Sequence, residues 1–368
     1  MPTLALDATY AADPEPTGTG VYSARLIAAL AALSVSSGAF LPEDSCRLTL
    51  CFRPGPYLRW ARRQKWPPGC SLQPLYEPFF CPRRVALFHG LNQRLLRRRY
   101  PAEVVTVHDV FPVSSPDYST PQFQERFTEI LRHAVRHATR IIAVSHATRE
   151  QLLRHTGAAE AQLRVVHHGV DPPQPASQEE KGAFRRALGF TADEPFFLNV
   201  GAIQARKNVS NIVLALRQVP GCRLVLAGGD GFGAQQTHAL IAREGLSGRV
   251  TVLGHAPYAS LRLLYSTATA LVFPSLEEGF GLPILEAMSY GLPVITSNCS
   301  SMPEVGGEAA LYVDPRSPEE IAAAMQRVAE DAELARDLSR KGRERAALFS
   351  WERCARETLQ VYREALGW

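Results

Sequence analysis

Short apolar segments alternate with amphipathic segments along most of the chain. In the first half, apolar runs of strand length lie at 4–6, 47–52, 85–89, 104–108, 141–145 and 164–167. Segments with helical periodicity lie at 21–33, 121–138 and 146–155. This alternation predicts a parallel β-sheet with helices packed on both faces.

A proline-rich segment interrupts the pattern at 171–180. Its sequence, DPPQPASQEE, predicts a linker between two domains. Beyond it, strand-like runs lie at 196–200, 223–227, 250–253, 270–274 and 293–296. Helical patterns lie at 208–218, 234–244, 258–266, 282–290, 317–331, 332–347 and 351–366. We therefore expect an α/β chain with two Rossmann-like domains in tandem, whose ligands bind at the carboxyl ends of the strands.

Length and composition agree with this organisation. The 368 residues exceed the ~250–300 residues at which a single hydrophobic core stops growing. A content of 46% hydrophobic and 21% charged residues is typical of a soluble globular enzyme. The N-terminus lacks the basic region of a secretory signal, and the seven cysteines include no CxxC pair. We therefore expect a cytoplasmic protein without a disulfide framework or a zinc site.

The segment 273–305 carries the densest candidate chemistry. Glu278 and Glu286 stand eight residues apart, a spacing that also arises by chance, but Glu278 follows an expected strand and Glu286 lies inside an expected helix. The glycines between them allow a ligand to approach the backbone, and the amides of the helix start can bind a phosphate. The two carboxylates could accept hydrogen bonds from hydroxyls at the two ends of a sugar nucleotide. The alternative is a surface acid followed by an ordinary acid in the first turns of a helix.

Two further groups of candidate residues follow expected strands. Arg206 and Lys207 precede an expected helix, where two cations could neutralise a diphosphate as its charge develops. His108 stands at the end of the run 104–108, where it could hydrogen-bond a sugar hydroxyl or move a proton. The alternatives are a solvated basic turn and a structural histidine.

Together these motifs resemble the family 4 retaining glycosyltransferases (glycosyl transferases group 1), which have the GT-B fold. The resemblance rests on EGFGLPILEAMSYGLPVITS with PEVGGEAALYVDP, and on VTVHDVFP, AVSHATRE, HHGVD, NVGAIQARKN, LVLAGGDG and VTVLGHAPYASLRLLYSTATALVFPS in the family order. It covers nearly the whole chain and is densest over 197–315. It implies two Rossmann-like domains that face a central cleft: residues 1–172 bind the acceptor and 173–350 bind the nucleotide-sugar donor. The last helix, within 351–368, is then expected to pack back on the first domain.

The resemblance also assigns roles to individual residues. It implies catalytic roles for His108, Arg206, Lys207 and Glu278. It implies donor-binding roles for Gly18, Gly20, Gly201, Gly254, Gly279, Phe280, Gly281, Leu282 and Glu286, with Asp109 and Ser145 as secondary candidates. Ala202 departs from the pattern, because many members carry Arg there, and Arg206 is expected to take that role. The family works without a bound metal, so neither a metal nor a cofactor is expected, and the nucleotide-sugar is a substrate.

The donor and the reaction class are less specified. The stretch 107–123 looks most like bacterial mannosyltransferases that use GDP-mannose in polysaccharide assembly. A UDP-glucose or UDP-N-acetylhexosamine donor stays open, because base recognition is largely through the backbone. A non-catalytic sugar-nucleotide-binding protein is the alternative from another class. An oxidoreductase is disfavoured, since the full GxGxxG fingerprint with its downstream acid is absent.

The segment 47–99 is strongly basic. It holds twelve Lys and Arg residues and one acid, Glu77, a net charge of +11, and eleven of the twelve are Arg. Arg favours bidentate recognition of phosphate or carboxylate. The interleaved aromatic residues are Tyr57, Trp60, Trp66, Tyr76, Phe79 and Phe80. We expect this segment to contact the cytoplasmic face of the inner membrane or to bind an anionic saccharide or lipid-linked acceptor. A solvated basic surface is the alternative, and no nucleic-acid partner is expected.

Overall fold

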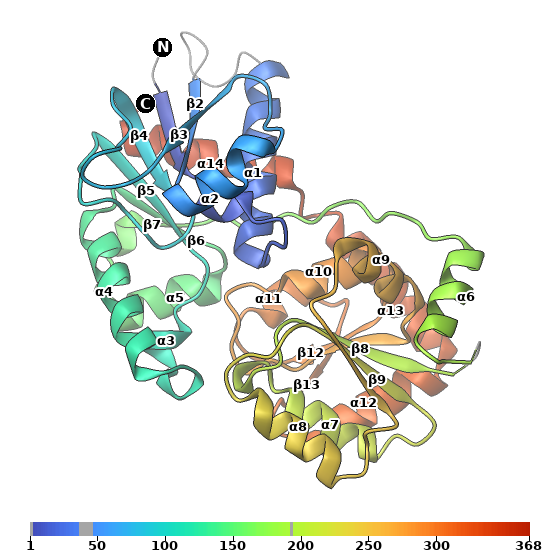
Figure 1. Cartoon of the computed structure of the whole chain (residues 1–368). Coiled ribbons are helices and arrows are strands. Elements are labelled where there is room, and N and C mark those ends of the chain that lie inside the picture. Colours follow the sequence, from blue (N-terminus) through green and yellow to red (C-terminus); the bar gives the residue numbers. More distant parts are fainter. Residues whose placement is uncertain (1–2, 37–46, 192–193) are drawn as a thin grey trace. The chain divides into compact units, whose positions relative to one another are not determined.

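A computed structural model describes residues 3–36, 47–191 and 194–368. The chain divides into two compact units. The first comprises Met1–Pro116, Thr120–Gly169 and Phe349–Trp368, and the second comprises Asp117–Ser119 and Val170–Leu348. Each unit is built on one sheet with helices against it (Figure 1). No helix in the described part of the chain combines the length and apolar character needed to cross a membrane.

The sheet of the first unit has seven strands, and every neighbouring pair is parallel. Its strand order is β3-β2-β1-β4-β5-β6-β7. The strands are β1 Thr3–Asp7, β2 Arg47–Phe52, β3 Cys70–Pro74, β4 Val85–Gly90, β5 Ala102–Val107, β6 Arg140–Ala143 and β7 Leu163–Val165. The central strands read as apolar runs because helices cover both faces. In β5 all six residues are buried.

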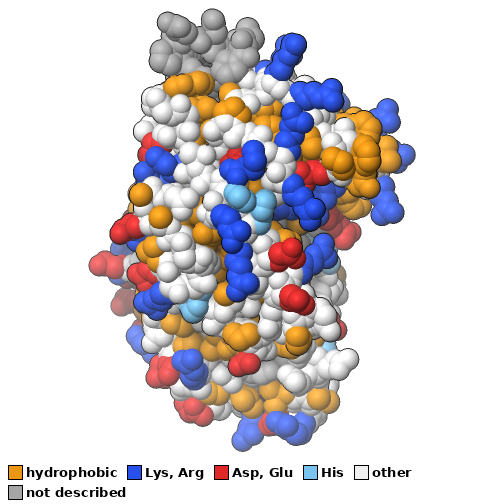
Figure 2. All heavy atoms as spheres, turned by 90° about the vertical axis from the view of Figure 1, so that its left-hand side faces the viewer, with side chains coloured by type: hydrophobic (Ala, Val, Ile, Leu, Met, Phe, Trp, Pro, Cys, Tyr) orange, Lys and Arg blue, Asp and Glu red, His pale blue; other side chains and the backbone are white. Residues whose placement is uncertain are grey.

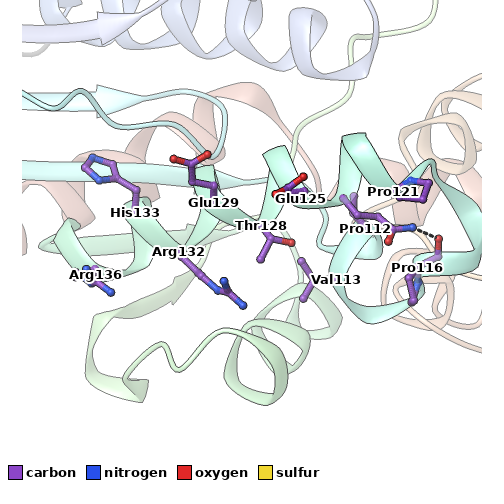
Figure 3. Close-up of a pocket in the computed structure, with 11 residues that line it drawn as sticks. Pro112, Val113, Pro116, Pro121, Glu125, Thr128, Glu129, Arg132, His133 and Arg136 are labelled. Atoms are coloured by element: carbon purple, nitrogen blue, oxygen red, sulfur yellow. Dashed lines mark hydrogen bonds between the residues drawn. The ribbon is translucent and has the colours of Figure 1, made fainter.

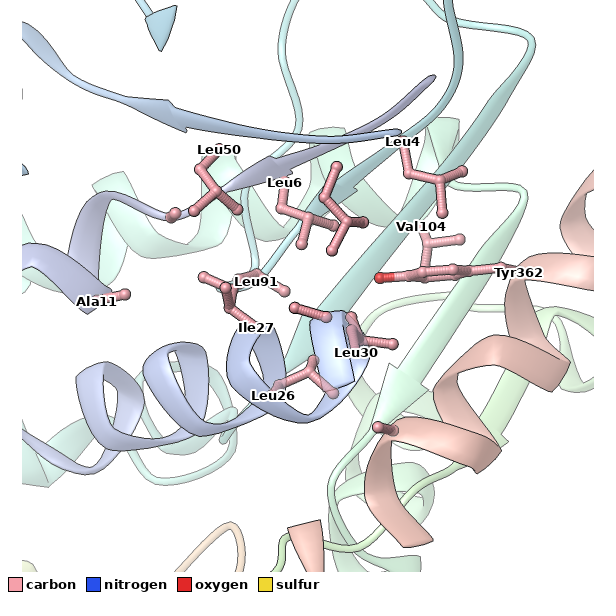
Figure 4. Close-up of a cluster of buried hydrophobic side chains, with 14 of the residues drawn as sticks. Leu4, Leu6, Ala11, Leu26, Ile27, Leu30, Leu50, Leu91, Val104 and Tyr362 are labelled. Carbon is pink, nitrogen blue, oxygen red and sulfur yellow. The ribbon is translucent and has the colours of Figure 1, made fainter. Parts of the chain in front are cut away.

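Two groups of helices cover the two faces of this sheet. The α-helices are α1 Gly18–Ser36, α2 Pro54–Arg59, α3 Phe111–Ser114, α4 Pro121–His137, α5 His146–His155 and α14 Trp351–Leu366. On one face, Leu26, Ile27 and Leu30 of α1 pack with Tyr362 of α14 and with strand residues such as Leu6 (Figure 4). A second cluster lies among β4–β6, α4 and α5. The C-terminal helix therefore packs on the first unit, as expected for the fold.

The second unit contains a six-stranded parallel sheet. Its order is β10-β9-β8-β11-β12-β13. The strands are β8 Phe196–Val200, β9 Arg223–Ala227, β10 Val250–Gly254, β11 Ala270–Phe273, β12 Val294–Ser297 and β13 Leu311–Val313. The α-helices are α6 Gln178–Ala187, α7 Val209–Arg217, α8 Ala234–Arg243, α9 Tyr258–Thr267, α10 Leu282–Ser289, α11 Met302–Gly306, α12 Pro318–Glu330 and α13 Ala332–Ala346. The strand order reverses between β8 and β11, which is where open α/β sheets bind ligands.

Several local predictions differ from the structure, and strand β13 and the short helices α2, α3 and α11 are not predicted from the sequence at all. The predicted linker 171–180 is too long, because α6 begins at Gln178, where the Ser177 hydroxyl caps the helix and Glu180 returns the contact. The first helix begins at Gly18 rather than at residue 21. The sequence does not predict strand β3, because CSLQP lacks a long apolar run and ends in a proline, which within sheets is tolerated at an edge strand such as this one. Cys46 lies outside the described residues, and the other six cysteines are free thiols.

Candidate active site

The loops after β8, β9 and β11 meet at the carboxyl edge of the second sheet. The Gly201 amide donates to the Ala227 carbonyl at 2.9 Å, and the Leu276 amide donates to the Arg206 carbonyl at 2.9 Å. These bonds tie the loop after β8 to the chain at the end of β9 and to the loop after β11. The three loops therefore form one connected site floor.

Three charged side chains converge on this floor. A guanidinium nitrogen of Arg206 lies 2.9 Å from one oxygen of Glu278, and Nζ of Lys207 lies 2.8 Å from the other. The side chains are 7%, 12% and 11% exposed, in the order Arg206, Lys207 and Glu278. We call these three residues the ion triad. It carries a net charge of +1 in a largely desolvated place, which suits an anion-binding site.

Backbone and side-chain groups hold the triad in position. The Ser275 hydroxyl donates to Glu278 Oε1 at 3.0 Å. The Glu278 amide donates to the Ser300 hydroxyl at 3.1 Å, and the Ser301 hydroxyl donates to the Glu278 carbonyl at 3.0 Å. Behind the cations, the Asn208 amide group donates to the Pro274 and Pro315 carbonyls at 3.0 and 2.6 Å. Each loop is thus fixed by bonds to another part of the unit.

Gly201 makes room for the lysine of the triad. Its φ is 126°, which an L side chain rarely adopts, and a Cβ placed there would lie 2.8 Å from Cε of Lys207. The glycine therefore serves the placement of Lys207. The Lys207 ammonium also lies 4.8 Å from the ring centroid of Phe273, and this cation–π contact further stabilises its position.

The two cations determine the charge of Glu278. Burial acts to raise the pKa of this carboxyl, but the nearby charges of Arg206 and Lys207 outweigh it and lower the pKa to about 2. Glu278 is therefore ionised at neutral pH. It can accept hydrogen bonds but cannot act as a general acid there.

Glu286 has a different environment on the same stretch of chain. Helix α10 begins after Gly281, whose φ is 103°, and Phe280 before it is buried. Glu286 lies in the second turn and accepts a 2.7 Å hydrogen bond from the Tyr265 hydroxyl. Burial raises the pKa of Glu286, and the Tyr265 hydrogen bond acts against that rise. The two glutamates thus differ, with Glu278 held by cations and Glu286 by a neutral hydroxyl.

His108 lies in the first unit, directly after β5. Its Nε2 donates to the Leu91 carbonyl at 2.9 Å, so in the neutral ring Nδ1 is the acceptor. The ring stacks on His168 with centroids 5.4 Å apart, and the Tyr22 ring meets its edge at 4.8 Å. Burial lowers the pKa of His108 to about 4, although the hydrogen bond to the Leu91 carbonyl acts to raise it. The imidazole is therefore neutral at pH 7.

The remaining predicted residues occupy varied positions. Gly254 ends β10 and forms a β-bridge with Gly228, so it lies at the same edge as the ion triad. Gly18 and Gly20 form the first turn of α1, where a Cβ on Gly20 would lie 2.8 Å from the Tyr10 carbonyl oxygen. Asp109 directly follows His108. Ser145 is buried, and its hydroxyl caps α5 by accepting from the Thr148 amide at 3.0 Å.

Several residues that support the site are not predicted from the sequence. Ser275, Ser300 and Ser301 hold Glu278, and Tyr265 bonds Glu286. Ser275 precedes Glu278 by three residues and could have been suspected from that spacing. Tyr265 lies in the last turn of the amphipathic helix α9, where nothing in the sequence distinguishes it from a core tyrosine.

A hollow of about 860 Å³ lies elsewhere in the first unit. It follows one side of α4 and reaches the α3 segment (Figure 3), with Glu125, Glu129, Arg132 and Arg136 among the residues that line it. The Gln124 amide group donates to the Pro116 carbonyl across one end of it. None of the predicted site residues lines this hollow. Size alone therefore does not identify the site.

Comparison with known proteins gives a consistent family assignment. The family model "Glycosyl transferases group 1" matches residues 180–345, and "Glycosyltransferase Family 4" matches residues 16–174. O-antigen chain mannosyltransferase B of Escherichia coli is 31% identical over 284 residues, which are 75% of this chain and 74% of that protein.

Solved structures agree on the fold. Sucrose-phosphate synthase from Thermosynechococcus elongatus matches with a TM-score of 0.77 and 25% identity, over 99% of both chains. HepE of Anabaena, solved in complex with UDP and glucose, matches with a TM-score of 0.75 and 20% identity, over 99% of this chain and 100% of that one. The predicted GT-B fold with two Rossmann-like domains is confirmed.

Proposed function

This chain belongs to the group 1, family 4 glycosyltransferases, and we propose that it moves a hexose from a nucleoside-diphosphate sugar to an acceptor with retention at the anomeric carbon. The donor we propose is GDP-mannose, and the product is part of a cell-surface polysaccharide or glycoconjugate. The mannose assignment is supported by the likeness to an O-antigen chain mannosyltransferase. A UDP-sugar is the alternative donor.

The ion triad is the observation that carries this proposal. Arg206 and Lys207 are largely desolvated, and together they place two positive charges against the single negative charge of Glu278. A donor diphosphate bound here would share these cations with Glu278. As the bond from the anomeric carbon to the phosphate oxygen breaks, negative charge grows on the diphosphate, and fixed cations stabilise that charge. This account assigns to protein cations the work that a metal ion performs elsewhere, so we propose that transfer needs no metal.

The two glutamates would bind opposite ends of the donor. Glu286, which a neutral hydroxyl holds, is proposed to accept from the ribose hydroxyls. Glu278, ionised at neutral pH, is proposed to accept from hydroxyls of the transferred hexose. The loop Gly279–Phe280–Gly281–Leu282 between them would bring backbone amides to the diphosphate. Gly201 and Gly254 lie at the same sheet edge and are proposed to border the donor.

His108 is proposed to act from the first unit. Its neutral ring offers a hydrogen-bond acceptor at Nδ1, because Nε2 is engaged by the Leu91 carbonyl. A neutral acceptor can orient a hexose hydroxyl without adding positive charge beside the oxocarbenium-like carbon. We propose the first unit, in which Gly18, Gly20 and Asp109 also lie, as the acceptor side. The acceptor is proposed to be a saccharide or a lipid-linked anion, with the protein in the cytoplasm and peripheral on the membrane.

A donor panel tests this proposal. Purified protein is incubated with EDTA and with GDP-mannose, UDP-glucose or UDP-N-acetylglucosamine, and release of the nucleotide is followed with and without saccharide acceptors. We expect turnover with GDP-mannose, and NMR of the product should show the anomeric configuration of the donor. Lys207→Ala serves as the inactive control. Inverted products, or activity only when magnesium is added, would contradict the proposal. Binding without turnover of any donor would favour the non-catalytic alternative.

A further inference from the structure

A second hollow of about 370 Å³ lies at the carboxyl edge of the first sheet. Arg53 follows β2, Leu75 follows β3 and Arg94 follows β4. Because the strands are parallel, these ends meet at one edge, and the three residues line the hollow together with Tyr76, Glu77 and Leu96. Arg53 and Arg94, which are 41 residues apart in the sequence, thus line one hollow together with the apolar side chains of Leu75 and Leu96.

The N–H donors of the two guanidinium groups at this hollow have no acceptor among the described residues. Both side chains are half-buried. Within the described part of the chain, neither guanidinium has a hydrogen bond or an ion pair, and that of Arg53 lies 6.0 Å from the ring centroid of Tyr10. Burial and the charge of Arg53 lower the pKa of Arg94. Two like charges that line one hollow repel each other, and an anion bound between them would relieve that repulsion.

The nearby carboxylates have other partners. Asp7 accepts from the Thr9 hydroxyl at 2.5 Å and from the Thr9 amide at 3.2 Å. Glu77 accepts from the Arg98 amide at 3.0 Å. Both carboxylates act on Arg94 through space, but neither lies within ion-pair distance of it. The N–H donors of the arginine pair therefore stay available to a ligand.

An exposed aromatic tip borders the same hollow. Tyr76 and Phe80 close a short loop by exchanging backbone hydrogen bonds of 2.8 and 2.7 Å. Tyr76, Phe79 and Phe80 are 53%, 69% and 55% exposed, and the Tyr76 and Phe79 rings stack with centroids 5.9 Å apart. The other aromatic residues of segment 47–99 differ, since Tyr57, Trp60 and Trp66 pack against the core. The aromatic tip, defined by Tyr76, Phe79 and Phe80, therefore leaves at least half of each ring residue exposed to solvent.

Basic side chains flank the tip in the sequence. Arg83 and Arg84 follow it by three and four residues and are exposed, as are Arg97 and Arg98. The Arg98 amide bond to Glu77 brings the latter pair to the base of the tip. In the space-filling view, Lys and Arg side chains are spread over one face of the molecule, and hydrophobic side chains gather among them (Figure 2). Exposed aromatic rings with exposed Arg residues on the neighbouring segments suit an anionic membrane surface, which has an apolar interior below a negatively charged layer.

We propose that the hollow between Arg53 and Arg94 binds the phosphate group of a membrane lipid while the aromatic tip enters the lipid layer beside it. Two guanidinium groups can grip a phosphate through paired hydrogen bonds. The tip places that phosphate at the depth of the headgroups. In the setting of the proposed function, on which this part alone rests, the bound lipid is the carrier of the acceptor. The site would thereby deliver the acceptor to the sheet edge that also bears His108.

Vesicle binding with matched variants tests this site. The full chain is co-sedimented with phosphatidylcholine vesicles that contain or lack phosphatidic acid, and is titrated with soluble dihexanoyl phosphatidic acid. Arg53→Gln and Arg94→Gln are compared with Arg132→Gln and Arg136→Gln, which remove the same charge at the hollow along α4. A fifth variant, the double substitution Phe79→Ser and Phe80→Ser, removes largely exposed apolar surface and no charge. Thermal unfolding checks that every variant is folded.

We expect binding only to vesicles with phosphatidic acid. Each of Arg53→Gln and Arg94→Gln should weaken both vesicle and short-chain lipid binding by about tenfold or more, the size of a lost charged hydrogen bond. The α4 variants should change vesicle binding by no more than about fivefold, the effect of one charge near an anionic surface. The tip variant should lose vesicle binding and keep the short-chain lipid.

Three results would overturn the proposal. Equal losses in all four arginine variants would mean diffuse charge attraction. Binding of the short-chain lipid that survives Arg53→Gln and Arg94→Gln would place the phosphate elsewhere, and absence of any binding to phosphatidic acid would exclude the site. Nucleotide affinity, measured on the same variants, keeps this test separate from the proposed function. Loss of the lipid site with intact nucleotide binding concerns the inference alone, whereas absence of nucleotide binding concerns the transferase proposal.

Discussion

Replacing Glu278 with Gln removes the one negative charge of the ion triad and keeps the shape of the side chain. Arg206 and Lys207 then remain largely buried without a carboxylate, since their side chains are only 7% and 12% exposed. Removal of one partner from a buried ion pair leaves an uncompensated charge, and this destabilises proteins by ~3–5 kcal/mol. We therefore expect Glu278→Gln to lower the free energy of unfolding of the second unit.

The pKa of Glu278 gives the magnitude independently. It lies at about 2, against an ordinary value of 4.5. The difference, at about 1.4 kcal/mol per pKa unit, stabilises the folded state by about 3 kcal/mol at pH 7. For a unit of this size that corresponds to a fall in Tm of about 6–12 °C. The destabilisation expected from breaking the buried ion pair and the one expected from the pKa shift of Glu278 therefore agree.

The pH dependence separates charge from packing. Because folding lowers the pKa of Glu278, its contribution is complete above pH 4.5 and is lost as the pH falls towards 2. The difference in unfolding free energy between wild type and Glu278→Gln should thus shrink to about 1.5 kcal/mol at pH 3. Urea unfolding at several pH values measures it. Glu308→Gln, an exposed position in the same unit, should cost less than about 0.5 kcal/mol.

The same substitution should have opposite effects on binding and turnover. With Glu278 neutral, the cations no longer share their charge with a carboxylate, so GDP affinity should hold or rise while transfer falls. A stability difference that stays constant from pH 7 to pH 3, or a large loss of GDP affinity, would refute this account of the triad.

Three further predictions concern individual groups. Lys207→Ala should lower the transfer rate by ~10²–10³ through loss of one fixed charge stabiliser, and added magnesium should not restore it. Burial raises the pKa of Glu286. As the pH is lowered, nucleotide affinity should therefore begin to fall at a higher pH than an ordinary carboxyl would cause. Titration calorimetry of Glu286→Gln should show weak binding without that pH dependence. Burial lowers the pKa of His108 to about 4, so the acid limb of kcat/KM should show no inflection near pH 6.5, where an exposed histidine would titrate.

Much of the fold could be predicted because parallel strands that are covered on both faces appear in the sequence as short apolar runs. Strands β2 and β8 begin and end at the predicted residues. Strand β3 could not be predicted in this way, because an edge strand needs neither a long apolar run nor every backbone donor. The start of helix α6, 178–180, falls in the predicted linker, because its cap, Ser177, follows prolines that dominate the local composition.

The site was predictable as a set of residues and not as an arrangement. The sequence indicates Arg206, Lys207 and Glu278 each as a substrate ligand. Their mutual pairing joins Glu278 to positions 71 and 72 residues earlier, which only the sheet brings together. Likewise, the environment that keeps His108 neutral comes from Tyr22 and His168, on segments far from it in the sequence. Spacing along the chain cannot report such contacts.

The basic segment shows the same limit. Its charge and its aromatic content were evident from the sequence, and all six aromatic residues carried equal weight there. The structure separates them into three that pack against the core, Tyr57, Trp60 and Trp66, and three that form the exposed tip. It also brings Arg53 and Arg94 to one hollow. The burial of each side chain separates the two groups of aromatic residues, and composition alone does not contain that information.

The central claim is that the second unit binds a nucleoside diphosphate through protein cations and Glu286, without a metal. Isothermal titration of GDP and UDP into the protein in EDTA tests it most directly, with Lys207→Ala and Glu286→Ala measured alongside. The account predicts GDP binding in EDTA that is tighter than UDP binding and is weakened by both substitutions. Binding that appears only with added magnesium, or that neither substitution changes, would contradict it.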